Sequence, residues 1–326
     1  MDLEALEFRS QTISKIRNFF DSKKYLELDT PALSTTLIPE TCLEVFKTEY
    51  IPPANSATNS AQSLFLVPSP EIYMKKIIAA HKRDVYQVSK CYRNTESTGR
   101  IHSPEFTMLE YYSMHKNYMD SLELTEALFT ALLPPKPSDP DSDPWQNLRP
   151  PFIRLTMDNA FEQFAGFKLS NCKTAHDLRA HVVRLGLYDE KDLEYWQMDE
   201  LYELILVNNI EPNLTFDKPV FLIDYPSFVP CLAKDKSPLW KERWELYANG
   251  IELANCYSEE TCANNVKEYF EIEGRLKNNS ARVPHAIDEN YWKTFIDFPE
   301  CSGVAMGVDR LIAVLGGYGS LEPILF

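Results

Sequence analysis

The residues best suited to chemistry lie between Val85 and Tyr112, in the stretch VYQVSKCYRNTESTGRIHSPEFTMLEYY. Two segments rich in β-forming residues flank a polar loop, which predicts a hairpin with an unusually long turn. The loop carries charged and titratable residues, Arg93, Glu96, Arg100 and His102. The second strand presents aromatic rings and a carboxylate on one face, from Phe106, Glu110 and Tyr112. Arginine matches phosphate oxygens, and an aromatic ring can stack on a base. The pattern is typical of a site for a planar, phosphorylated ligand, although an ordinary hairpin with a solvated charged turn fits this segment equally well.

A second hairpin, predicted for residues 242–257 around the turn Asn249-Gly250, carries two further acids. Glu245 and Glu252 would lie on neighbouring strands. Two carboxylates together with phosphate oxygens are the hard ligands that Mg²⁺ prefers. Without other context, two solvated strand glutamates would be the simpler interpretation.

Acidic and polar side chains also gather around one predicted cleft. Period-two alternation places Asn255, Tyr257 and Glu259 on one face of their strand, and Glu71 begins a helix after Ser69-Pro70. A glutamate in a first helical turn often only complements the helix dipole. Several carboxylates around one cleft need a counter-charge, however, which indicates a ligand with an ammonium side chain.

Composition limits the partners. The chain has 326 residues with 48 acids against 33 bases, a net charge of −15, and no basic cluster that would suit phosphate backbones. It has no run of eighteen apolar residues, its first twenty residues lack the apolar core of a signal peptide, and its seven cysteines form no CxxC pair. We expect a cytoplasmic protein with reduced thiols and with neither a membrane nor a tRNA partner.

Helical and strand patterns surround these residues. Hydrophobic spacing predicts a helix and a strand before Pro31, and the proline-rich stretch 134–151 predicts an exposed connector. Further helices are predicted at 71–81, 117–133, 157–165, 174–186, 198–209, 259–277 and 288–298, and a strand that runs into a helix is predicted at 301–310.

Three segments resemble the motifs of class II aminoacyl-tRNA synthetases, in the lysyl branch. The initial helix, strand and Pro31 resemble motif 1, Arg93 with residues 100–110 resembles motif 2, and CSGVAMGVDR at 301–310 resembles motif 3. The resemblance implies an α+β fold in which an antiparallel sheet is flanked by helices, and a homodimer. It also implies a single catalytic domain over residues 1–326 with a mainly helical insertion at about 134–215. Because motif 1 begins near residue 8, we expect no N-terminal anticodon-binding OB-fold domain.

The same resemblance implies a site that uses ATP and Mg²⁺ to form an aminoacyl-adenylate. Arg93 and Arg310 would act on the triphosphate from two sides, so that fixed cations stabilise the charge that builds on the α-phosphate. The resemblance assigns ATP to Arg93, Glu96, Arg100, His102, Phe106, Glu245, Glu252 and Arg310, with the metal on Glu245 and Glu252. It assigns the amino acid to Glu71, Glu110, Tyr112, Asn255, Tyr257, Glu259 and Ala305.

An acidic, lysine-type catalytic core without an anticodon domain is similar to the elongation factor P (R)-β-lysine ligase family. The segments SPE at 69–71, PEFTMLE at 104–110 and GIELAN at 250–255 carry this resemblance, and Ala305 stands where lysyl-tRNA synthetases typically have glycine. It implies transfer of (R)-β-lysine to a lysine of elongation factor P. The chain departs from the family pattern at Thr95, Cys256, Tyr257 and Cys262.

Two alternatives remain at this point. One is a lysine-type adenylating ligase with another acceptor, which includes tRNA. The other is an inactive paralogue with a binding or regulatory role, which the retention of Arg93, Phe106, Glu245, Glu252 and Arg310 argues against.

Overall fold

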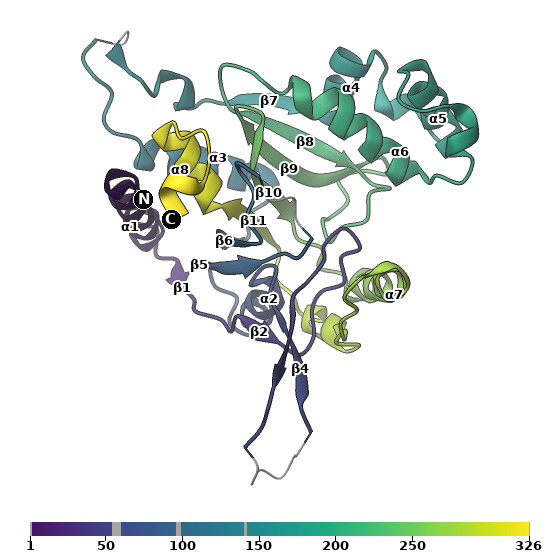
Figure 1. Ribbon diagram of the computed structural model, residues 1–326, viewed down its shortest axis with the longest axis horizontal. Coiled ribbons are helices and arrows are strands. Elements are labelled where there is room, and N and C mark those ends of the chain that lie inside the picture. The colour runs from purple at the N-terminus through teal and green to yellow at the C-terminus, as the bar shows by residue number, and fades with distance from the viewer. Residues whose placement is uncertain (1, 54–59, 96–98, 140–141, 326) are drawn as a thin grey trace.

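The computed structural model describes residues 2–53, 60–95, 99–139 and 142–325, and its centre is an eight-stranded sheet (Figure 1). The strands lie in the order β1 (Leu26–Glu27), β5 (Val85–Tyr92), β6 (Glu105–Met114), β11 (Cys301–Gly307), β10 (Ile251–Ser258), β9 (Trp240–Ala248), β8 (Val220–Pro226) and β7 (Ile153–Thr156). The outermost pairs, β1–β5 and β7–β8, are parallel, and the five inner pairings are antiparallel. The predicted hairpins are β5–β6 and β9–β10.

Three helices cover one face of the sheet: α1 (Leu3–Ser22), α3 (Tyr118–Leu132) and α8 (Val308–Gly316). The buried residues of α1 include Ile16, Phe19 and Phe20, whose spacing forms one helical face, and Asp2 caps its first turn. Phe20 stacks on Tyr86 at 4.8 Å between ring centroids. This layer places the amino-terminal helix against α8, close to the other end of the chain (Figure 1).

A smaller layer contains α2 (Glu71–His81) and α7 (Ala263–Ser280), with the three-stranded sheet of β2 (Leu33–Ser34), β4 (Gln62–Leu66) and β3 (Lys47–Tyr50) beside it. The helix predicted at 288–298 is wrong: only Tyr291–Phe295 form a short 3₁₀ turn. Aromatic residues have weak helix propensity, and here Tyr291 packs on Phe270 at 5.0 Å, so ring packing decides the backbone.

Between α3 and β8 the chain is mainly helical. It contains the helices α4 (Met157–Ala165), α5 (Ala175–Arg184) and α6 (Met198–Ile205). Shorter turns lie around them: the π turn Leu206–Ile210 and the 3₁₀ turns Gln146–Leu148, Leu169–Asn171, Glu190–Leu193 and Glu211–Asn213. Elsewhere, α9 (Glu322–Leu325) ends the chain's helices. The helices α4 to α6 share a core with the outer strands, in which Phe161 and Tyr202 stack near Leu222 and Tyr247. Within the described ranges, none of the helices combines the length and the apolar content needed to cross a bilayer.

Candidate active site

The register of the central strands explains why a pocket forms. Glu110 of β6, Ala305 of β11 and Asn255 of β10 are direct cross-strand neighbours, and so are Tyr112, Gly303 and Tyr257. The middle residue of each row is small, so a hollow remains between the larger side chains on either side. A Cβ atom on Gly303 would lie 2.5 Å from Tyr112 Cε1 and 2.5 Å from Glu259 Oε1, and therefore only glycine fits there.

This hollow is a cavity of about 90 Å³. The seven residues predicted to bind the amino acid all line it: Glu71, Glu110, Tyr112, Asn255, Tyr257, Glu259 and Ala305. They come from α2 and from three strands or strand ends, which the sheet register brings together. Glu40, from the loop between β2 and β3, also lines the cavity and was missed from the sequence.

A lysine that the sequence reasoning missed neutralises two of these acids. Lys75 is fully buried, and its Nζ lies 2.5 Å from Glu71 Oε1 and 2.6 Å from Glu259 Oε2. Burial alone would lower the pKa of Lys75, but the Glu259 and Glu71 carboxylates raise it well above its ordinary value. Its spacing of four residues from Glu71 on a helix was the available signal. The pocket therefore has one built-in ammonium group that holds two of its walls together.

Glu110, like Glu40, lines this cavity without an ion pair to Lys75. Its side chain is 3% exposed, its Oε1 accepts a hydrogen bond from the Tyr112 hydroxyl at 2.7 Å, and its Oε2 is buried without a hydrogen-bond partner. Burial, and then repulsion from Glu71, raise the pKa of Glu110 to about 8. A buried acceptor without a partner is costly, and a cationic ligand in the cavity would satisfy it.

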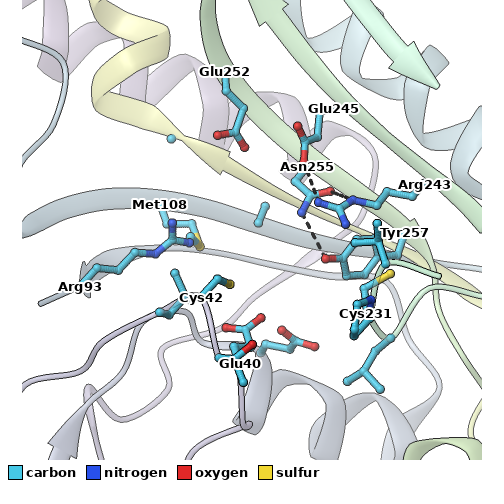
Figure 2. Close-up of a pocket in the computed structure, with 18 of the residues that line it drawn as sticks. Glu40, Cys42, Arg93, Met108, Cys231, Arg243, Glu245, Glu252, Asn255 and Tyr257 are labelled. Carbon is cyan, nitrogen blue, oxygen red and sulfur yellow. Dashed lines mark hydrogen bonds and ion pairs between the residues drawn. The ribbon is translucent and has the colours of Figure 1, made fainter. Parts of the chain in front are cut away.

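A larger cavity of about 700 Å³ adjoins the first (Figure 2). The residues predicted to bind ATP that line it are Arg93, His102, Phe106, Glu245, Glu252 and Arg310. The Arg93 guanidinium lies 5.3 Å from the Phe106 ring centroid, and its Nε is buried without a partner. The cation therefore lies over the aromatic ring, and both kinds of group suit a nucleotide, the cation for phosphate and the ring for the base.

Arg310, at the start of α8, contacts two other segments at this cavity, the loop before β6 and strand β10. It donates to the carbonyl oxygens of Ile101 at 3.2 Å and Glu252 at 3.0 Å. The preceding residue, Asp309, is 2% exposed and accepts from the Thr107 amide at 2.7 Å and from Arg9 at 2.9 Å. The start of α8 is therefore fixed to β6, so the position of Arg310 is determined by the fold.

Glu245 and Glu252 lie on β9 and β10, as the second hairpin predicts, but each has an arginine neighbour. Glu245 accepts from Arg243 at 2.7 Å and from the Tyr247 hydroxyl at 2.7 Å, and Glu252 Oε2 lies 3.5 Å from Arg310. Loss of hydration in the cavity, and then repulsion from Glu245, raise the pKa of Glu252 to about 7. Two carboxylates that repel each other fit a divalent cation between them. Among the described residues, no group of three or more acids, histidines or cysteines could ligate a metal, so phosphate oxygens would have to complete such a site.

Arg243 is a further site residue that the sequence reasoning missed. It lies on β9, donates to Asn255 Oδ1 at 3.2 Å as well as to Glu245, and covers the rings of Tyr225 and Tyr257 at 4.2 and 5.4 Å (Figure 2). Arg243 therefore connects Asn255, which lines the smaller cavity, to Glu245, which lines the larger one. Alternation along β9 places Arg243, Glu245 and Tyr247 on one face, which was the signal available for it.

One of the predicted ATP-binding residues that the structure describes, Arg100, is not brought into the cavity. Arg100 is exposed and is not among the described residues that line either cavity, although its carbonyl accepts from the Leu321 amide at 2.7 Å. Glu96 lies outside the described residues. The roles of both stay predictions.

Comparison with known proteins agrees with this architecture. The sequence model of the family described as tRNA synthetases class II (D, K and N) matches residues 3–326. The chain is 30% identical over 326 residues to a protein of Vibrio atlanticus named elongation factor P–(R)-β-lysine ligase, which covers 99% of this chain and 94% of that protein. Proteins of the same name from Pectobacterium atrosepticum (33% over 313 residues, covering 93% and 88%) and Proteus mirabilis (32% over 321 residues, covering 97% and 92%) are also similar. The chain thus belongs to the class II tRNA synthetases (D, K and N) and, within them, to the elongation factor P (R)-β-lysine ligase family. The predicted fold class is confirmed.

Proposed function

We propose that this chain activates a lysine-type amino acid, (R)-β-lysine, with ATP and transfers it to a lysine side chain of elongation factor P. The first step forms an aminoacyl-adenylate and releases pyrophosphate. The second step forms an amide and releases AMP. The activity makes the chain an ATP-dependent ligase.

The observation that carries this proposal is the unpaired carboxylate oxygen of Glu110. Four glutamates line the smaller cavity, Glu40, Glu71, Glu110 and Glu259, and the buried ammonium of Lys75 forms ion pairs with Glu71 and Glu259. A second ammonium, supplied by the substrate, would give Glu110 Oε2 its missing partner. An acidic or amide substrate would offer this oxygen no cationic partner.

The larger cavity supports ATP as the second substrate. Phe106 offers a face to the adenine ring, while Arg93 and Arg310 lie where a triphosphate would pass between them. The substrate carboxylate attacks the α-phosphate, and the charge that builds there is stabilised by these fixed guanidinium groups. Positioning and electrostatics are sufficient for this step, and no side-chain nucleophile takes part.

Magnesium fits the same region. Glu252 and Glu245 would hold the ion together with phosphate oxygens. Glu245 would first have to give up its ion pair with Arg243. The bound ion would neutralise phosphate charge. Repulsion between the two carboxylates supports this assignment.

The surroundings of the larger cavity favour a protein acceptor over tRNA. Asp199, Glu200 and Glu203 of α6 and Glu273 of α7 line it, and the chain carries a net charge of −15. Acidic side chains repel a phosphate backbone and attract the ammonium group of a lysine. The same chemistry would serve a small-amine or carrier acceptor, which is the main competing function.

We also propose that residues 1–326 act as one catalytic unit, with the mainly helical segment at about 134–215 as an insertion, and that two copies associate. Exposed Leu3, Leu26 and Leu33 on α1, β1 and β2 support an apolar contact between copies. Light scattering of the purified protein should give the mass of a dimer.

The test of the proposed activity is ATP–pyrophosphate exchange with (R)-β-lysine, (S)-β-lysine and α-lysine. We expect exchange with (R)-β-lysine at the highest kcat/KM. Absence of exchange with any of the three would favour an inactive paralogue.

A further inference from the structure

The two cavities meet at a junction that two carboxylates border. Of the described glutamates, only Glu40 and Glu71 line both cavities. If the nucleotide occupies the larger cavity and the amino acid the smaller one, the reactive carbonyl of the adenylate lies at this junction. A group at the junction is therefore placed to act on the transfer step.

Glu40 is the carboxylate of this pair that remains available. Glu71 is held by Lys75 at 2.5 Å, whereas no described side chain forms a hydrogen bond or ion pair with the Glu40 carboxylate. Glu40 comes from the loop between β2 and β3 and faces the pocket (Figure 2). Glu44 holds this loop in place by accepting the amides of Arg282 and Val283 at 2.9 and 3.1 Å. The contacts of Glu44 therefore fix the position of the loop that carries Glu40.

Transfer to a lysine amine needs a proton acceptor that adenylation does not need. An unperturbed lysine has a pKa of about 10.4, so its nitrogen carries no free electron pair at neutral pH. One proton must leave before that pair can attack the carbonyl carbon. The carbon–oxygen bond to the phosphate then breaks, AMP leaves with its electrons, the second nitrogen proton passes to water, and an amide remains.

We propose that Glu40 is the general base that accepts the first proton from the acceptor's ammonium group. The inference rests on the proposed function, because it requires an adenylate and an amine acceptor. It assigns Glu40 to the transfer step and not to ATP or amino-acid activation.

The charges that face Glu40 are consistent with this role. Burial and repulsion from Glu71 raise the pKa of Glu40. The positive charges of Arg93, Lys75 and Lys277 lower it, and the resulting pKa is about 7. The other titratable groups that face it are Cys42, Tyr257 and Tyr269. A base with a pKa near the working pH is largely ionised yet still basic enough to take a proton.

Single-turnover transfer from enzyme loaded with ATP and (R)-β-lysine tests the inference. In Glu40→Gln, transfer to elongation factor P should fall about 10²- to 10⁴-fold at pH 7. It should then rise roughly tenfold per pH unit up to pH ~9, because the amine must lose its proton to solvent. The wild-type rate should level off above pH ~7, and Glu40→Asp should keep the wild-type profile at a lower rate. Glu49→Gln, which removes an exposed carboxylate on β3, is the matched control.

Hydroxylamine as the acceptor distinguishes a general base from a residue needed for adenylation or for the fold, because hydroxylamine is uncharged at neutral pH and needs no base. Glu40→Gln should form the hydroxamate of the amino acid within about threefold of the wild-type rate. An equal loss with hydroxylamine, a parallel loss of pyrophosphate exchange, or unchanged transfer at pH 7 would each overturn the inference. If the wild-type enzyme itself forms no hydroxamate and shows no exchange, the proposed function fails and this inference fails with it.

Discussion

Replacing Glu110 by glutamine removes the carboxyl group that would ionise to pair with a substrate ammonium in the smaller cavity, while the shape of the side chain stays the same. Glu110 is 3% exposed, and its Oε2 has no partner within the described residues. A hydrogen bond to a charged group contributes about 1.5 to 3 kcal/mol. At 1.4 kcal/mol per factor of ten, the KM for the amino acid should rise about 10- to 150-fold.

The same change should stabilise the free protein at alkaline pH. The pKa of Glu110 is about 8 in the folded state, against 4.5 for an unperturbed glutamate. Because the folded-state pKa is raised, folding loses stability as pH rises from about 4.5 to about 8. Glutamine cannot ionise, so the Tm of Glu110→Gln should exceed that of the wild type by a margin that grows across this window. For a chain of this length, one kcal/mol corresponds to about 1 to 2 °C.

Two assays check this prediction: pyrophosphate exchange against amino-acid concentration, and thermal melts from pH 5 to 8.5 with and without (R)-β-lysine. Tyr112→Phe is a matched control, because it removes the hydroxyl that contacts Glu110 but keeps the charge. A KM within twofold of the wild type, together with parallel melting curves, would refute the assignment of Glu110 to the substrate ammonium.

Four further predictions concern the walls of the two cavities. Arg310→Ala should lower pyrophosphate exchange about 10²- to 10³-fold while circular dichroism stays unchanged; near-full exchange would contradict the mechanism. Arg243→Met should cost about 3 to 5 kcal/mol in urea unfolding, because it leaves the buried Glu245 carboxylate without its cationic partner, and a loss below 1 kcal/mol would argue against that pairing. Gly303→Ala should abolish amino-acid binding in calorimetry but keep ATP binding, since its Cβ would collide with Tyr112; unchanged amino-acid affinity would show that the cavity is not the pocket. Exchange should stop with EDTA and recover with Mg²⁺, and Glu252→Gln should raise the Mg²⁺ concentration required; an unchanged requirement would remove this residue from the metal site.

Much of the candidate site was predictable because strands obey a simple rule. Alternation placed Asn255, Tyr257 and Glu259 on one face, and the register of β10, β11 and β6 then brings that face beside Glu110 and Tyr112. The turn Asn249-Gly250 correctly predicted the hairpin that carries Glu245 and Glu252, and both turn residues have positive φ. Local patterns thus gave the strands and the direction of their side chains.

The groups that neutralise and connect the site were harder to find. Lys75 and Arg243 lie within four residues of predicted acids, yet nothing local says that the pairs are buried together. The contact of Asp309 with the Thr107 amide joins residues about 200 positions apart, which only the fold can create. Glu40 lies in a loop without periodicity, so no sequence pattern indicated it. Long-range packing, and not secondary-structure pattern, decides these positions.

The most direct test of the proposed activity is the intact mass of unmodified elongation factor P after incubation with this enzyme, ATP, Mg²⁺ and (R)-β-lysine. We predict a shift by one lysyl group on a single lysine, which depends on ATP and is lost with Arg310→Ala. An unchanged mass under conditions in which the enzyme exchanges pyrophosphate would contradict the proposed acceptor and would assign the adenylate to a different amine.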